Sequence, residues 1–147
     1  MMIVLGIESS CDETAVALVN DKKEILGEAL LSQEEHKAFG GVVPEIAARS
    51  HLEHIDDILE QCFARTNLSL KDVDAIAASS GPGLIGGVVV GVMTAKGLSI
   101  ALNKPFVIVA NSSNPTSEYT KALAKKLEEK YCASVIPTDC SSLNLDD

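Results

Sequence analysis

The chain has 147 residues, of which 46% are hydrophobic and 22% charged, and its formal net charge is −9. This length predicts one domain with a sizeable core, and the acidity argues against a free-standing nucleic-acid binder, because phosphate contacts need Lys and Arg. Four scattered cysteines without a CxxC pair indicate free thiols in the reducing cytoplasm, and they argue against a zinc site.

The first feature in chain order is a polar loop between two apolar runs. The runs Ile3–Ile7 and Thr14–Val19 are short and rich in Val, Ile, Leu and Ala, which favours a strand–turn–strand unit. The loop, residues 8–13, holds three carboxylates, two hydroxyls and a thiol at the end of a buried strand. Such a loop could bind phosphate or a metal, or position a nucleophile. A solvated hairpin turn is the alternative.

A third strand and a long helix follow. Residues 24–31 are predicted to be a strand antiparallel to the second, and 32–41 a polar loop. Pro44 suits the first turn of a helix, and apolar residues recur at helical spacing as far as Arg65. His51 and His54 lie three apart on this helix. They lack the spacing of a zinc HExxH motif, so we expect a helix-face or interface role and no metal.

Glycines follow the next predicted strand and recur along the helix after it. Residues 75–79 form a predicted strand, and Gly81 and Gly83 turn it into a helix over 84–102. Gly83, Gly87 and Gly91 lie four apart, so they share one helix face that another backbone can approach closely. Packing is the favoured reading of these glycines, with phosphate binding second. The same glycines interrupt the low-charge stretch 79–94, which therefore does not predict a membrane span.

The chain ends with a predicted strand, helix and strand. These cover residues 106–110, 115–131 and 134–137, with Asn114 or Ser113 as the helix cap, and an acidic end follows at 141–147. We expect residues 111–147 to complete the domain formed by 1–110. Three antiparallel strands followed by alternating helices and strands predict an α/β fold with a mixed sheet covered on both faces.

Four segments in order resemble the TsaD family, enzymes that transfer a threonylcarbamoyl group from threonylcarbamoyl-adenylate to N6 of adenosine 37 in tRNA. The segments are LGIESSCDETAVALV near the N-terminus, GGVVPEIA from Gly40, RSHLEHI from Arg49, and SGPGL from Ser80 with the later glycine, Ala-Lys and Lys-Pro steps. The resemblance covers about residues 1–109. It implies one ribonuclease-H-like lobe of the actin/Hsp70-type ATPase fold.

The resemblance also implies roles for residues. Asp12 and Glu13 are the catalytic candidates, which would orient the attacking adenosine amine or assist removal of its proton. Ser9, Ser10, Cys11, Gly81 and Gly83 are the phosphate and substrate candidates. The expected interface is made by His51, Ile55, Ile58, Gly87 and Gly91. A TsaB-like paralogue and a TsaE-like ATPase are the implied partners, tRNA would be reached only through partners or a further lobe, and an uncovered interface predicts a homodimer.

The resemblance stops after Val109. The family continues with an HxxxH pair that supplies ligands for a divalent metal, iron or zinc, and here Asn111-Ser112-Ser113 follows instead. From Asn111 the chain resembles the end of a P-loop NTPase domain, in particular a spore-coat morphogenetic ATPase. This combination predicts a chimera, natural or engineered, that has no metal site and is inactive alone. A binding or dimerisation module, or a chimera without activity, is the alternative.

Overall fold

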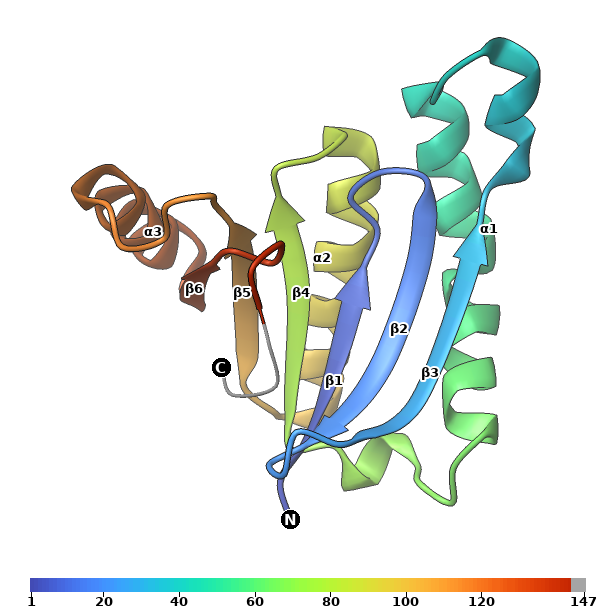
Figure 1. The fold of residues 1–147 in the computed structure, drawn as a ribbon. Helices are drawn as coiled ribbons and strands as arrows, with labels where there is room; N and C mark the ends of the chain where they lie inside the picture. Colours follow the sequence, from blue (N-terminus) through green and yellow to red (C-terminus); the bar gives the residue numbers. More distant parts are fainter. Residues whose placement is uncertain (144–147) are drawn as a thin grey trace.

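The computed structural model describes residues 1–143, which form one six-stranded sheet and three α-helices (Figure 1). The strands are β1 (Ile3–Glu8), β2 (Glu13–Asn20), β3 (Ile25–Ser32), β4 (Ala75–Gly81), β5 (Phe106–Asn111) and β6 (Ser134–Thr138). The helices are α1 (Pro44–Ala64), α2 (Ile85–Leu102) and α3 (Glu118–Tyr131), with short 3₁₀ turns at Glu34–Phe39 and Leu70–Asp72. The first of these turns lies where a plain loop was expected.

The strand order is β3-β2-β1-β4-β5-β6, and every strand except β2 runs in the same direction. This arrangement confirms the predicted α/β fold class with its mixed, ribonuclease-H-like sheet. Three hairpin-connected strands open the domain because each apolar run is short and a turn follows it. The later strands are parallel, so a helix must connect each one to the next.

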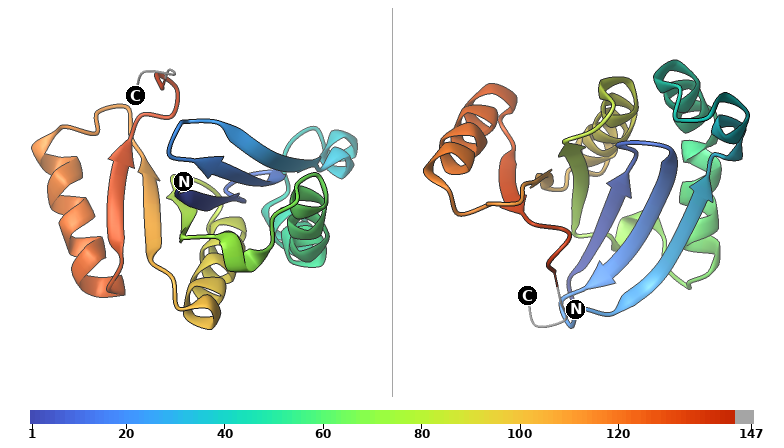
Figure 2. Two further views of the ribbon diagram at one scale, coloured as in Figure 1. Left: turned by 90° about the horizontal axis from the view of Figure 1, so that it is seen from below. Right: turned by 45° about the horizontal axis from the view of Figure 1, so that its top comes forward.

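The prediction that helices cover both faces of the sheet is wrong for the described residues. The steps from β3 to β4, β4 to β5 and β5 to β6 all move the same way across the sheet. Right-handed crossovers therefore place all three helices on one face. Consistent with this, α1 packs against β2, β3 and α2 (Figures 1 and 2). Residues of α2 and α3 line a common groove over β5.

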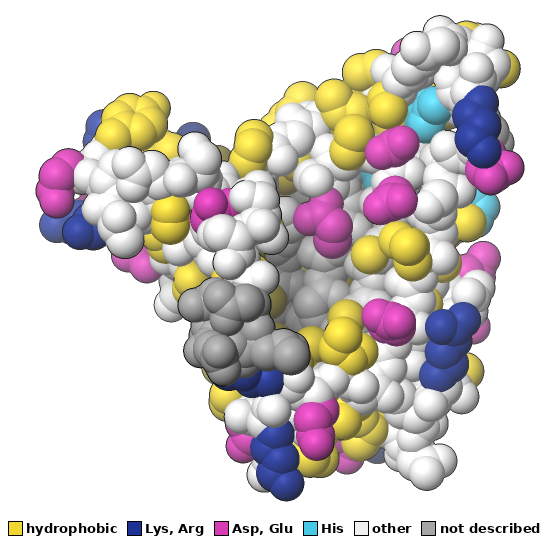
Figure 3. Space-filling view, viewed as in Figure 1, with side chains coloured by type: hydrophobic (Ala, Val, Ile, Leu, Met, Phe, Trp, Pro, Cys, Tyr) yellow, Lys and Arg dark blue, Asp and Glu magenta, His cyan; other side chains and the backbone are white. Residues whose placement is uncertain are grey.

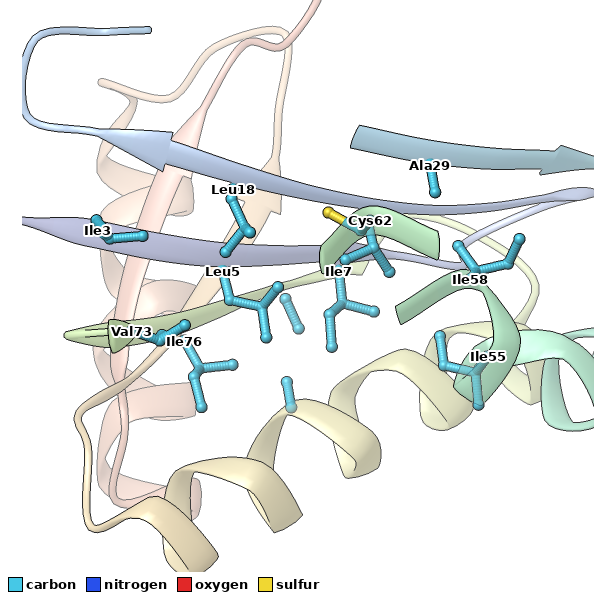
Figure 4. Packing of buried hydrophobic residues seen from close by; sticks show 13 residues of the cluster. Ile3, Leu5, Ile7, Leu18, Ala29, Ile55, Ile58, Cys62, Val73 and Ile76 are labelled. Atoms are coloured by element: carbon cyan, nitrogen blue, oxygen red, sulfur yellow. The ribbon is translucent and has the colours of Figure 1, made fainter. Parts of the chain in front are cut away.

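The core lies between the sheet and α1 and α2. Ile3, Leu5 and Ile7 alternate with half-buried residues along β1, and all three point toward the helices (Figure 4). From α1, Ile55 and Ile58 complete this layer. Only 3% of the chain is aromatic, so the core is packed from aliphatic side chains that the two sequence periods, 2 and 3.6, predict.

The C-terminal segment extends the same sheet. Strand β6 pairs in parallel with β5, and Ile108, Ala124 and Val135 form a second, smaller core cluster. Helix α3 begins at Glu118, three residues later than predicted. Its cap is Ser117, whose Oγ accepts the Thr120 N–H, and neither Asn114 nor Ser113 takes that place. Of the acidic end expected at 141–147, residues 144–147 lie outside the described residues.

The face of the sheet away from the helices contains a hollow of about 400 Å³ (Figure 3). Small residues form its floor, and two carboxylates, Glu8 and Glu28, stand among its lining residues. Glu8 is also the last residue of β1 and opens the polar loop.

Candidate functional site

The polar loop at residues 9–12 leaves the carboxyl end of β1, between β1 and β2. The turn after β4 lies beside it, because β4 pairs in parallel with β1 and the Leu84 N–H donates to the Ser10 carbonyl at 2.7 Å. In open α/β sheets, ligands bind in the crevice outside the carboxyl ends of the strands. The loop is therefore the part of this chain to test first for a site.

Ser9 anchors the start of the loop to α2. Only 1% of the residue is exposed, its Oγ donates to the Gly87 carbonyl at 2.8 Å, and the same oxygen accepts the Gly91 N–H at 3.0 Å. A hydroxyl has one hydrogen to donate, and that hydrogen is used here. Ser9 thus has a structural role, and the expected donation from its hydroxyl to a phosphate is not available in this structure.

The glycine face of α2 receives this loop. A Cβ added at Gly87 would lie 2.5 Å from the Ser9 carbonyl oxygen, and one added at Gly91 or Gly83 would clash with Ser9 or Ser10. The prediction that a backbone approaches this face closely is confirmed, and the backbone is the chain's own. Gly87 and Gly91 are buried beneath the loop, so their expected role in an interface with another molecule is wrong.

His51 anchors the middle of the loop. Its side chain is fully buried, with Nε2 at 3.0 Å from the Cys11 carbonyl oxygen and Nδ1 at 2.7 Å from Thr14 Oγ1. Ile55 and Ile58 are 5% and 3% exposed. The expectation that these three residues form a free interface is therefore wrong.

Thr14 is a site residue that the sequence analysis missed. It is fully buried, as are the alternate β2 residues Val16 and Leu18. Its place in that alternation could have predicted a buried hydrogen-bond partner, because a polar residue on a buried face needs one. A similar signal marked His51, which lies four residues after Ala47 and four before Ile55 on the buried stripe of α1.

The carboxylates lie beyond these anchors, toward solvent. Asp12 is half-buried and Glu13 is exposed, with its Oε1 accepting the Ser32 hydroxyl at 2.9 Å. Cys11 is also exposed. Partial burial, followed by the hydrogen bond and charge of the Asp12 side chain, raises the pKa of the Cys11 thiol above its usual value. Cys11 is therefore a thiol and no ready nucleophile at neutral pH, which leaves Asp12 and Glu13 as the acid–base candidates.

A second pocket, of about 400 Å³, lies at the carboxyl ends of β4, β5 and β6. Gly81 is among its lining residues, together with Asn111, Ser112 and Thr120. Asn111 Oδ1 accepts the Cys140 N–H, and Ser112 Oγ is 3.2 Å from Thr120 Oγ1. The polar groups here are thus mostly engaged with one another, and Gly81 takes a backbone φ of +137° that favours glycine.

The residues after β5 do not fit the iron or zinc site that the family resemblance implies. Both metals need imidazole, thiolate or carboxylate ligands, whereas Asn111, Ser112 and Ser113 offer an amide and two hydroxyls. Among residues 1–143, no group of three or more His, Cys, Asp or Glu could hold a metal ion.

The outer face of α2 is apolar and exposed. Ile85, Val89 and Met93 recur at intervals of four with exposed fractions of 76%, 47% and 59%, and Ile100 continues the stripe. Leu52 of α1 is also exposed, one turn from Ala48, which lies against the α2 residue Gly86. By length and composition α2 could cross a membrane. One such helix is only weak evidence for a membrane span. We call these five exposed residues the outer stripe.

Two family models match the chain. The model of the tRNA N6-adenosine threonylcarbamoyltransferase family matches residues 24–114, and that of the ATPase domain of stage IV sporulation protein A matches residues 93–147. The two matches overlap over residues 93–114, from the middle of α2 to just past β5.

Curated relatives resemble the first part of the chain. The tRNA N6-adenosine threonylcarbamoyltransferase of Paramagnetospirillum magneticum is 62% identical over 109 residues, which is 74% of this chain and 31% of the relative. That of Rickettsia rickettsii (strain Sheila Smith) is 56% identical over 110 residues, 74% of this chain and 32% of the relative. The chain therefore spans about a third of the length of these relatives.

Among solved structures, YeaZ from Pseudomonas aeruginosa superposes with a TM-score of 0.60 at 21% identity. The match covers 88% of this chain and 49% of YeaZ. At this identity the likeness establishes a shared fold.

Proposed function

Because this chain belongs to the tRNA N6-adenosine threonylcarbamoyltransferase family, we propose that it is the loop-bearing lobe of a threonylcarbamoyl transfer site. The observation that carries the proposal is the loop itself. Two internal anchors, Ser9 and His51, hold its backbone, and the Asp12 and Glu13 side chains project beyond them. A fixed backbone with carboxylates at the solvent side is what a positioned acid or base requires, although Glu13 also accepts the Ser32 hydroxyl.

Asp12 and Glu13 are the residues proposed to act on the adenosine amine. A carboxylate accepts a hydrogen bond from an attacking amine and can take its proton as the new bond forms. Ser10 and Cys11, with Gly81 and Gly83 of the neighbouring turn, would line the approach of the acyl donor. Ser9 stays beneath them as an anchor.

The lobe is proposed to be inactive alone. The chain spans about a third of the length of its curated relatives. Residues 1–143 hold no group of three or more His, Cys, Asp or Glu that could bind a metal. The net charge is −9, so tRNA must be held by another lobe or chain. Metal chemistry would likewise be supplied from outside this chain.

We propose that the segment from Asn111 onward has a separate origin. Support comes from the change of family match along the chain, since the first match ends at residue 114 and the second covers residues 93–147. The segment nevertheless adds α3 and β6 to the sheet and buries Ala124 and Val135. A joined segment that completes the sheet protects the edge of β5.

The outer stripe of α2 is the proposed docking surface for a TsaB-like paralogue. A helix that is apolar on all sides needs cover on both faces, and the residues of this stripe remain 47–76% exposed, although Ile85, Val89 and Met93 also line the groove that α2 shares with α3. The shared fold with YeaZ (TsaB) supports a paralogous partner, and without it the same stripe would pair two copies of this chain. Cover by protein is consistent with a cytoplasmic location, and a TsaE-like ATPase would act on that assembly.

The transfer reaction tests this proposal. The purified chain is incubated with tRNA, threonylcarbamoyl-adenylate and a divalent metal, and modified adenosine is measured by mass spectrometry. A complete family member serves as the positive control. We expect modification with the control and none with this chain; modified adenosine made by this chain alone would contradict the proposed incompleteness.

A further inference from the structure

Three polar side chains of the helix-covered side, His51, Gln33 and His36, form a continuous line of hydrogen bonds. Gln33 Nε2 donates to the Ala47 carbonyl at 3.2 Å and lies 3.5 Å from His51 Nδ1. Gln33 Oε1 is 2.8 Å from His36 Nε2, and the Val43 N–H donates to His36 Nδ1 at 3.2 Å. Both histidines are at most 5% exposed.

The direction of every bond in this line is fixed by its ends. A carbonyl only accepts, so His51 Nε2 carries a hydrogen toward Cys11. The Ala47 carbonyl likewise orients the Gln33 amide, which turns Oε1 toward His36. A backbone N–H only donates, so His36 Nδ1 accepts from Val43 and Nε2 carries the hydrogen. His51 Nδ1 therefore accepts, from the Thr14 hydroxyl at 2.7 Å and over a longer contact of 3.5 Å from the Gln33 amide. The donors along the line thus all point from Val43 to Cys11, and Thr14 is the nearer donor to the His51 ring.

We propose that His51 is a positioning residue for the loop that carries Asp12 and Glu13, with Thr14 and Gln33 orienting its ring and His36 orienting Gln33. We call this line, from the Val43 N–H to the Cys11 carbonyl, the relay. Bonds aligned in one direction in a buried setting polarise and strengthen one another. The relay also ties the loop to the segment that precedes α1. Its value for transfer rests on the proposed function, whereas its effect on the loop does not.

Matched variants of His51 separate positioning from packing. In His51→Gln the side-chain amide can still donate to the Cys11 carbonyl, because it reaches the place of Nε2. In His51→Asn the shorter amide reaches the place of Nδ1 and leaves that carbonyl unpaired. Circular dichroism must show an intact fold for both.

The Leu84 amide is the probe, because it donates to the Ser10 carbonyl beside Cys11. Losing one buried hydrogen bond should raise its hydrogen exchange about tenfold in His51→Asn and much less in His51→Gln. His36→Leu touches no loop residue and should also raise it, since His51 is then less firmly oriented. Equal exchange in His51→Asn and His51→Gln, or an unchanged rate in His36→Leu, would overturn the proposal.

A spectroscopic measurement on the unmodified chain keeps the proposal testable if the variants unfold. Nitrogen-15 chemical shifts of the imidazole rings report which nitrogen carries the hydrogen. The expected result at neutral pH is the Nε2–H form for both His36 and His51. An Nδ1–H form for either ring is incompatible with a relay in this direction. Neither measurement depends on threonylcarbamoyl transfer. A failure of the relay therefore leaves the proposed function standing, and a failure of the proposed function leaves the relay standing.

Discussion

Ser9 illustrates how one residue can look like a ligand in the sequence and serve as an anchor in the fold. Its hydroxyl both donates to and accepts from the backbone of α2, which passes beneath the loop. Only glycine permits this approach, because any Cβ at Gly87 would meet the Ser9 carbonyl. The glycines of α2 therefore help to hold the loop in place.

Alanine substitutions at two glycines of the same helix should have opposite effects on stability. Gly87→Ala places a Cβ 2.5 Å from the Ser9 carbonyl oxygen, and overpacking of this kind costs about 1–3 kcal/mol. Gly97 has no atom within 4 Å of an added Cβ, so Gly97→Ala should stabilise the helix by about 0.5–1 kcal/mol. Urea unfolding measures both. Equal changes would show that the loop does not rest on this face.

At this scale the sequence could predict the loop, its carboxylates and the glycine face, since residue types and spacing carry them. It could not predict what lies opposite that face. An interface and a packed loop both require small residues four apart. Only the fold shows that Ser9 meets α2 and that Ser10 meets Gly83 in the turn before it. The burial of His51 was open to prediction from its spacing, whereas its bond to Cys11 required the turn geometry.

At the scale of elements, α2 has two apolar sides, of which one is buried within the described residues and the other is exposed. The inner side packs on the sheet and α1, with Ala95 fully buried, and the outer stripe is exposed. Sequence periodicity could not separate the two sides, because a helix that is apolar all round has no polar face to mark the solvent. Strand and helix positions were predictable because the apolar runs are short and glycine, proline or a polar loop ends them.

The outer stripe should mediate association. Met93→Asp places a charge at its centre, which should weaken binding to a TsaB-like partner, and self-association of the chain alone, by at least about tenfold. Tyr119→Asp, at an exposed residue of α3 outside the stripe, is the matched control and should change neither. Sedimentation of the chain with and without partner gives both affinities. If Met93→Asp leaves both unchanged, the stripe is not the docking surface.

For the whole molecule, the order in which helices connect the strands decides which face of the sheet has no helix over it. Three crossovers in one direction place all helices together, so the face with Glu8 and Glu28 has no helix over it among residues 1–143. The sequence predicted the order of elements correctly, and the wrong prediction of two covered faces came from leaving out the handedness of the crossovers. The sequence predicted a helix and a strand after residue 110 that complete the domain, but not that the strand pairs in parallel with β5, because few residues of this segment are apolar.

The most direct test of the central claim, that this chain is the loop-bearing lobe of a transfer site, is a graft. The matching 109 residues of the Paramagnetospirillum magneticum relative are replaced by those of this chain, and tRNA modification is measured with the relative's own partners. We predict activity within about tenfold of the parent, lowered by about 10²-fold or more in Asp12→Asn or Glu13→Gln. A folded graft without activity, or full activity in both carboxylate variants, would contradict the claim.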